Sequence, residues 1–316
     1  MKNYKHALLV MDKQEYPAEA KEVLIRTEEK ILANEKADKL YDSIYKAYWL
    51  KKKNFHDFSD KIKAISELID EHVYTINLVL LLNCTKPLLA AYKKEGISED
   101  IYWNTIIDLK VKMLECKENH DIWGTFVEGW FLPFYKLERF GLGRFQYELS
   151  DFCTELYCEH DVVIKDSEFV VGMHIPSHLG GLTYDVRLDS YKKAYEFFKD
   201  RFPGKHAYFC CSSWLLYPDN LNILPENSNV SDFLLDFEPL DITRTYDFGD
   251  AWRVFGADAN KPVNELPRKT SMQRAFAEWF EQGKKPGHAY CLLIFDGENI
   301  ITRNSREEFR EKYGYL

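Results

Sequence analysis

The spacing of apolar residues predicts that the first part of the chain is helical. In several segments apolar side chains recur every three or four positions, which is the period of a helix with one buried face. Residues 73–82 are apolar nearly all round, as expected for a buried central helix, and Pro87 could kink or stop that helix. Ser98, followed by two acids, is typical of a helix start. The helices are expected at 18–33, 38–50, 58–68, from 73 onward, and 98–116.

After about residue 120 the pattern changes to short apolar runs, which later alternate with helical segments. Strands are expected at 141–149, 154–158, 162–164, 169–175, 207–216, 242–248 and 289–295. Helical segments are expected at 186–202, 219–237, 252–255 and 271–281. In this order several strands come first, and strands then alternate with helices. The order predicts a mixed α/β sheet flanked by helices. The sequence thus predicts an all-α domain over 1–120 and an α/β domain over 121–316.

The composition of the chain argues against nucleic acid and membranes as partners. The chain of 316 residues carries a net charge of −9, so it has no basic footprint for nucleic acid. No apolar stretch approaches the ~20 residues that span a bilayer, and no signal peptide is visible. The seven cysteines include no CxxC pair, which favours free thiols in a reducing cytoplasm. The sequence does not fix the oligomeric state.

The stretch VVGMHIPSHLGGLTYD, residues 170–185, is the strongest candidate for a ligand site. A strand that runs through a glycine-containing turn into a helix can cradle phosphate, because the helix start offers unpaired N–H groups. The alternative is a tight turn that needs glycine only for its backbone angles. The candidate cofactor-binding residues are Ser177, His178, Gly180, Gly181, Leu182 and Thr183.

Two strand ends carry candidate catalytic side chains. His174 ends the strand before the glycine loop and could act as a base, or it could be a half-buried structural histidine. Ser213 ends the strand at 207–216, and Trp214 follows it as a pocket wall or core residue. If the two strands are parallel neighbours, both ends open into one crevice. His174 and His178 are not expected to bind metal, because Pro176 excludes a helix between them.

A cysteine-dependent hydrolase is a competing interpretation. Cys210 and Cys211 precede the serines on the same strand, and a nucleophilic cysteine could pair with His174. Adjacent apolar cysteines are more often core residues.

The chain resembles a bacterial acyltransferase family in which a helical N-terminal domain precedes a GNAT-like acyltransferase domain. The resemblance covers about residues 125–297 and rests on GLGRFQYEL, VVGMHIP, DSYKKAYEFF, CCSSWLLYP and LPENSNVSDF. It implies transfer of an acyl group from acetyl-CoA or another acyl-CoA to an amine of a small-molecule or peptide acceptor, without a metal. The loop would hold the CoA pyrophosphate, His174 would be the base, and Ser213 would return a proton to the CoA thiolate.

The resemblance also places Trp214, Trp130 and Tyr135 around the substrate pocket, with the last two on the acceptor side. The sequence departs from the family at the loop, whose signature is Gln/Arg-x-x-Gly-x-Gly/Ala. Here His178 stands where the Gln or Arg would be, and no second glycine falls in register. A GNAT-like protein that has lost catalysis and binds a ligand or partner is therefore the alternative function.

Overall fold

A computed structural model of the chain describes residues 4–244 and 247–314. The chain divides into two compact units, Met1–Gly141 and Leu142–Leu316, each described by itself below. The division falls later in the chain than the predicted boundary near residue 120, which coincides with the end of a long helix.

The first unit is helical, as predicted. Its elements are α1 (Tyr4–Lys13), α2 (Ala18–Ala33), α3 (Glu35–Lys51), η1 (Phe55–Phe58), α4 (Ser59–Ile69), α5 (Val73–Lys94), α6 (Glu99–His120), η2 (Glu128–Phe131) and α7 (Leu132–Tyr135). The Ser98 side chain accepts a hydrogen bond from the Asp100 amide at the start of α6, which confirms the predicted cap. Pro87, which could kink or stop the helix, does not stop it, because α5 continues through it.

Packing explains why α5 tolerates its proline. Thr85 and Leu88 on either side of Pro87 are completely buried, so tertiary contacts hold the helix in place despite the missing N–H group. In the part of the chain that the structure describes, α5 is also the one helix long and apolar enough to cross a bilayer. Since 67% of that apolar window is buried inside the protein, its composition is also that of a core helix.

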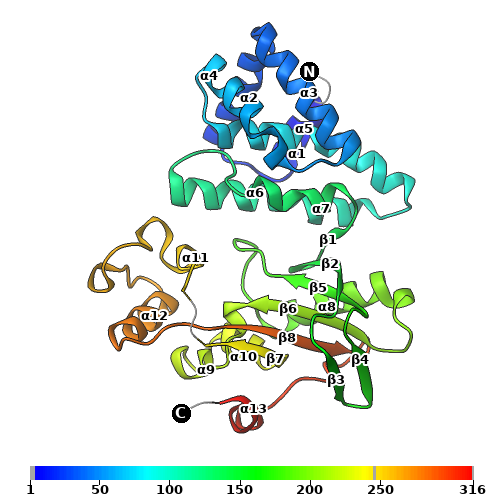
Figure 1. Ribbon diagram of the computed structural model, residues 1–316, viewed down its shortest axis with the longest axis vertical. Helices are drawn as coiled ribbons and strands as arrows, with labels where there is room; N and C mark the ends of the chain where they lie inside the picture. The colour runs from blue at the N-terminus through cyan, green and yellow to red at the C-terminus, as the bar shows by residue number, and fades with distance from the viewer. Residues whose placement is uncertain (1–3, 245–246, 315–316) are drawn as a thin grey trace. The chain divides into compact units, whose positions relative to one another are not determined.

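The second unit holds most of a mixed sheet of six strands in the order β1-β2-β5-β6-β8-β7, and the division between the units falls within β1 (Figure 1). The strands are β1 (Arg139–Leu142), β2 (Phe145–Asp151), β5 (Phe169–His174), β6 (Ala207–Ser213), β7 (Glu238–Thr243) and β8 (His288–Phe295), and a separate hairpin joins β3 (Leu156–Glu159) to β4 (Val162–Lys165). The helices are α8 (Tyr184–Phe198), η3 (Lys199–Arg201), η4 (Trp214–Leu216), α9 (Asn220–Ile223), α10 (Asn229–Leu234), α11 (Trp252–Phe255), η5 (Gly256–Asp258), η6 (Val263–Glu265), α12 (Ser271–Glu281) and α13 (Arg306–Tyr313).

Different elements cover the two faces of this sheet. Tyr191 of α8 stacks against Phe145 of β2 and Phe209 of β6, so α8 covers one face. On the other face, side chains of the β3–β4 hairpin form a buried cluster with Val170 of β5 and Cys210 of β6. Successive strand residues point to opposite faces, and this alternation decides which side chains meet near the strand ends.

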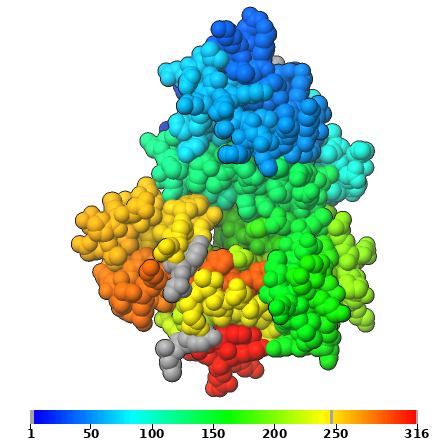
Figure 2. Space-filling view, in the orientation of Figure 1, coloured from blue at the N-terminus to red at the C-terminus, as the bar shows by residue number. Residues whose placement is uncertain are grey.

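The connection from β7 to β8 contains α11 and α12, whose side chains form an apolar cluster together with Trp214 and Leu224. In Figure 2 it forms a gold-to-orange lobe beside the strands. The predicted strand 242–248 is displaced in the structure, because β7 begins at Glu238 and ends at Thr243; residues 245–246 of that prediction lie outside the described residues.

The fold-class prediction is confirmed by the mixed sheet and its flanking helices after a helical unit. The predicted single strand at 141–149 is wrong, because it is split between β1 and β2 by a turn. Gly143 in this turn has φ of +74°, and a Cβ there would lie 3.0 Å from the Cα of Ser190. The Ser190 hydroxyl accepts from the Phe145 amide and donates to the Leu142 carbonyl, which fixes the turn against α8.

Candidate active site

The site lies at the carboxyl ends of β5 and β6, which are parallel neighbours as predicted. Their register pairs Val171 with Phe209 and Gly172 with Cys210. β5 then continues to His174 and β6 to Ser213 with no further residues paired between these two strands, although each stays paired with its other neighbour. Two strands that lose their pairing at one end leave room for a ligand between them, as open α/β sheets do.

His174 forms a close pair with Glu148. The Nε2 atom of His174 lies 2.7 Å from Oε1 of Glu148, and both side chains are partly exposed. Glu148 is opposite Gly172 in the β2–β5 register, so it is the diagonal neighbour of His174 on the same face of the sheet. A carboxylate at this distance fixes the orientation of the imidazole and stabilises its protonated form, which is what a general base needs.

Gly172 makes room for the Glu148 side chain. A Cβ at residue 172 would lie 3.1 Å from Cγ of Glu148 and 3.5 Å from its Oε1, the atom that faces His174. The glycine is therefore needed for close approach rather than for a turn. Gln146 is directly opposite His174, and its buried Nε2 has no hydrogen-bond partner among the residues that the structure describes. A buried donor beside the dyad is a place for an ordered water or a substrate oxygen.

Two arginines, Arg144 and Arg187, donate hydrogen bonds to the backbone of the loop that follows His174. Nη1 of Arg144 donates to the Pro176 carbonyl at 2.8 Å, and its Nε donates to the Gly180 carbonyl at 3.2 Å. Nη1 of Arg187 donates to the Leu182 carbonyl at 2.6 Å. Three loop carbonyls therefore point toward buried guanidinium groups.

The arginines also determine where the loop amides point. In a trans peptide the N–H group is directed opposite to the preceding carbonyl. The N–H groups of Ser177, Gly181 and Thr183 consequently point away from the arginines. Those of Gly181 and Thr183 have no hydrogen-bond partner in the described part of the chain, and both residues are exposed.

The start of α8 adds further donors. Thr183 caps the helix without a side-chain hydrogen bond, so the first-turn amides remain available beside the positive end of the helix dipole. A Cβ at Gly181 would lie 3.8 Å from Nδ2 of Asn229, which brings a side-chain amide next to the loop. This set of outward N–H groups fits a diphosphate.

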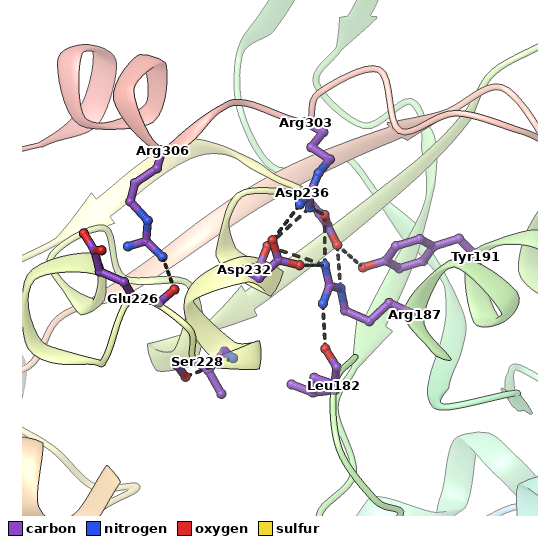
Figure 3. Close-up of polar contacts among 10 residues, drawn as sticks. Leu182, Arg187, Tyr191, Glu226, Ser228, Asp232, Asp236, Arg303 and Arg306 are labelled. Atoms are coloured by element: carbon purple, nitrogen blue, oxygen red, sulfur yellow. Dashed lines mark hydrogen bonds and ion pairs between the residues drawn. The ribbon is translucent and has the colours of Figure 1, made fainter. Parts of the chain in front are cut away.

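Arg187 belongs to a partly buried ion network whose charges balance (Figure 3). Its guanidinium is fully buried and donates to Asp236 at 2.8 Å and to Asp232 at 2.7 Å. Arg303 pairs with the same two aspartates, and the Tyr191 hydroxyl donates to Asp236. Two arginines and two aspartates leave no net charge, so Arg187 orients the loop without making it electropositive.

The remaining predicted loop residues have distinct surroundings. Leu182 is buried and anchors the loop, whereas Gly180 is exposed with φ of +85°. His178 is exposed with φ of 57°, and its Nδ1 lies 2.7 Å from the Ser177 hydroxyl. The predicted cofactor-binding residues thus form one loop, from which the amides of Gly181 and Thr183 face outward.

The structure does not bring Ser213 to the face of His174. By strand alternation Ser212 shares that face, and Ser213 points to the opposite one. The Ser213 hydroxyl accepts from the Leu215 amide at 3.1 Å. Trp214 is buried in the cluster with Phe276 of α12. The catalytic role of Ser213 and the pocket role of Trp214 stay predictions.

The cysteines have the character of core residues. Burial raises the pKa of Cys210 to about 12 and raises that of Cys211 also. A nucleophilic cysteine needs a lowered pKa. These environments therefore do not favour the hydrolase interpretation.

Trp130 and Tyr135 belong to the helical unit. Nε1 of Trp130 donates to Asp108 at 2.8 Å, and the guanidinium of Arg139 lies 3.7 Å from its ring centroid. Tyr135 is buried and donates to the Leu81 carbonyl at 2.7 Å. Their proposed place on the acceptor side stays a prediction.

Sequence reasoning missed Glu148 and Arg144, although both lie in the quoted run GLGRFQYEL. The apolar alternation of Phe145, Tyr147 and Leu149 drew attention to one face of the strand, while Glu148 is on the other. A charged residue on a strand in the middle of the sheet was the available signal. The role of Arg144 could not be predicted, because residues 141–149 were predicted to form one strand without the turn at Gly143.

Comparison with known proteins agrees with this architecture. Residues 7–137 match the N-acyltransferase N-terminal domain, and residues 140–293 match the GNAT-like C-terminal domain. No curated protein matches the chain.

Solved structures share the fold. An acyltransferase in complex with decanoyl-CoA and teicoplanin is 18% identical with a TM-score of 0.68, over 91% of this chain and 87% of that one. An acyltransferase in complex with decanoyl-CoA is 25% identical, and one in complex with CoA and 10C-teicoplanin is 21% identical; both have TM-scores of 0.58 over 70% of this chain. The alignment spans 66% of the length of each of these two structures.

Together the two domain matches extend over residues 7–293 with a short gap. The chain therefore belongs to the acyltransferase family that joins an N-acyltransferase N-terminal domain to a GNAT-like C-terminal domain.

Proposed function

We propose that the protein transfers an acyl group directly from acyl-CoA to an amine of a small-molecule or peptide acceptor. The observation that carries this proposal is the Glu148–His174 pair, which stands at the diverging ends of β5 and β6 and immediately before the loop with outward amides. The family supports the reaction class. Similar structures hold CoA, decanoyl-CoA and octanoyl-CoA, which supports an acyl-CoA as co-substrate.

The chain's own groups suit the steps of such a transfer. The amides of Gly181 and Thr183 would bind the diphosphate of CoA. The acceptor amine would attack the thioester carbon, the C–S bond would break, and the thiolate would leave. We assign to His174, which Glu148 orients through Nε2, the proton that the attacking amine loses, directly or through water. A backbone N–H of β6 would polarise the thioester carbonyl.

Finer points of the proposal rest on the sequence and on relatives. One of the similar structures is a complex with teicoplanin and another is a complex with 10C-teicoplanin, which supports a small-molecule or peptide acceptor here. A cytoplasmic, bacterial enzyme without nucleic-acid or membrane partners remains our expectation from cysteine usage, charge and the resemblance. The second candidate function is a GNAT-like protein that has lost catalysis and binds a ligand or partner, which the missing second glycine of the loop favours.

The first test is a thermal-shift titration with CoA, acetyl-CoA, decanoyl-CoA and, as a control, NAD. A ligand at about 100 times its Kd adds about 2.7 kcal/mol of stability. Gly181→Glu places a bulky carboxylate among the outward amides and should abolish the shift, whereas Gly204→Glu, an exposed position elsewhere in the unit, should not. A shift with NAD alone, or none with any CoA, would refute the proposal. CoA binding without turnover of any acyl donor would favour the second candidate.

A further inference from the structure

Arg144 and Arg187 both donate to carbonyls of the loop, but only Arg187 is paired with carboxylates. It is only 8% exposed, and its hydrogen bonds go to the carbonyls of Pro176 and Gly180. Within residues 4–244 and 247–314 it has no carboxylate partner. Arg187, by contrast, is neutralised by Asp232 and Asp236.

A buried cation without a counter-charge is costly, because charges removed from water are normally paired. Burial lowers the pKa of Arg144 to about 10, so the group remains charged at neutral pH. The Phe145 ring centroid lies 5.8 Å from its guanidinium carbon. This unbalanced charge lies directly beneath a loop whose outer side presents unpaired amides.

The backbone around Arg144 is held in place by hydrogen bonds to α8. It follows Gly143 in the tight turn between β1 and β2, and Ser190 of α8 bonds to the backbone on both sides of that turn. Since α8 also begins at the end of the loop, the turn and the loop are tied to the same helix. The acid in the first turn of α8, Asp185, is exposed.

We infer that Arg144 is a positioning residue for the diphosphate of acyl-CoA: it holds the carbonyls of Pro176 and Gly180 inward, and it supplies the positive charge that this loop lacks in its own side chains. The inference rests on the proposed function and deepens it. It assigns the anion selectivity of the loop to a residue outside the glycine motif, on a turn that precedes the motif in the chain.

The test compares ligands that contain the diphosphate with one that does not. Arg144→Gln should weaken binding of CoA and of dephospho-CoA about 10- to 150-fold, the range for loss of one charge-assisted interaction. The KM for an S-acyl pantetheine, which has no diphosphate, should stay unchanged. Arg201→Gln removes an exposed arginine of the same unit and should leave all three values as in the wild type.

Arg144→Lys serves as the second variant if Arg144→Gln fails to fold. It keeps the charge but cannot reach both carbonyls with a planar fork, so it should lose less CoA affinity than the Gln variant and keep the same KM for acyl pantetheine.

CoA affinity within two-fold of the wild type in folded Arg144 variants would overturn the inference while leaving the proposed function intact. An equal loss of affinity for acyl pantetheine would show that Arg144 has a merely structural role. A loss with CoA that is absent with dephospho-CoA would assign Arg144 to the 3′-phosphate. Either result would overturn the inference. A wild type that binds no CoA would overturn the proposed function as well.

Discussion

Neutralising Glu148 tests the assignment of His174 as the base without altering the size of either side chain. In Glu148→Gln the 2.7 Å contact to Nε2 loses its negative charge. Two full charges at that distance would interact by about 6 kcal/mol at an effective dielectric of about 20. Both side chains are about a quarter exposed, so water screens much of this. A charge-assisted hydrogen bond contributes roughly 1.5–3 kcal/mol, and we use that range.

The expected result is a fall in kcat of about 10- to 150-fold. The KM for acyl-CoA should change little, because neither member of the dyad belongs to the loop that would bind the diphosphate. His174→Ala should lower kcat by about 10²-fold or more. The double variant should be no slower than His174→Ala, because Glu148 acts only through the imidazole.

Steady-state kinetics with a saturating amine acceptor and detection of the released thiol would measure these values. Glu155→Gln, an exposed neutralisation in the same unit, is the matched control and should behave as the wild type. Full activity of Glu148→Gln, or losses that add in the double variant, would refute the reasoning.

Two further substitutions test the surroundings of the carboxylates of Glu148 and Glu28. Gly172→Ala places a Cβ 3.1 Å from Cγ of Glu148. We expect it to lower kcat roughly five-fold, because Glu148 would lose part of its contact with His174, and to leave CoA affinity unchanged. An unchanged kcat would show that the Glu148–His174 pair tolerates displacement. In the helical unit, burial raises the pKa of Glu28 to about 7, above the usual 4.5, so the stability that its neutral form provides is present below pH 4.5 and lost as pH rises through 7. Glu28→Gln should remove up to about 3 kcal/mol of that pH dependence in urea unfolding, whereas exposed Glu29→Gln should keep it; equal profiles for both variants would contradict the burial argument.

Periodicity was sufficient for most of the helical unit and for the order of elements in the α/β unit. The helix predicted at 18–33 matches α2 at both ends, because its buried face follows the helical period over four turns. The ends of other elements shifted where tertiary packing outweighed a local signal, as at Pro87 in α5. The strand at 207–216 ends early for a local reason: the Ser213 hydroxyl caps a short turn at Trp214.

The sequence alone determined that His174 ends a strand, that a glycine loop follows it, and that a helix begins after the loop. These features are local in the chain, so composition and spacing reveal them. Only the tertiary structure decided that Glu148 meets His174 and that Arg144 lies beneath the loop. Both depend on the β2–β5 register and on a turn fixed by α8, and contacts between residues distant in the chain leave no periodic signal in a single sequence.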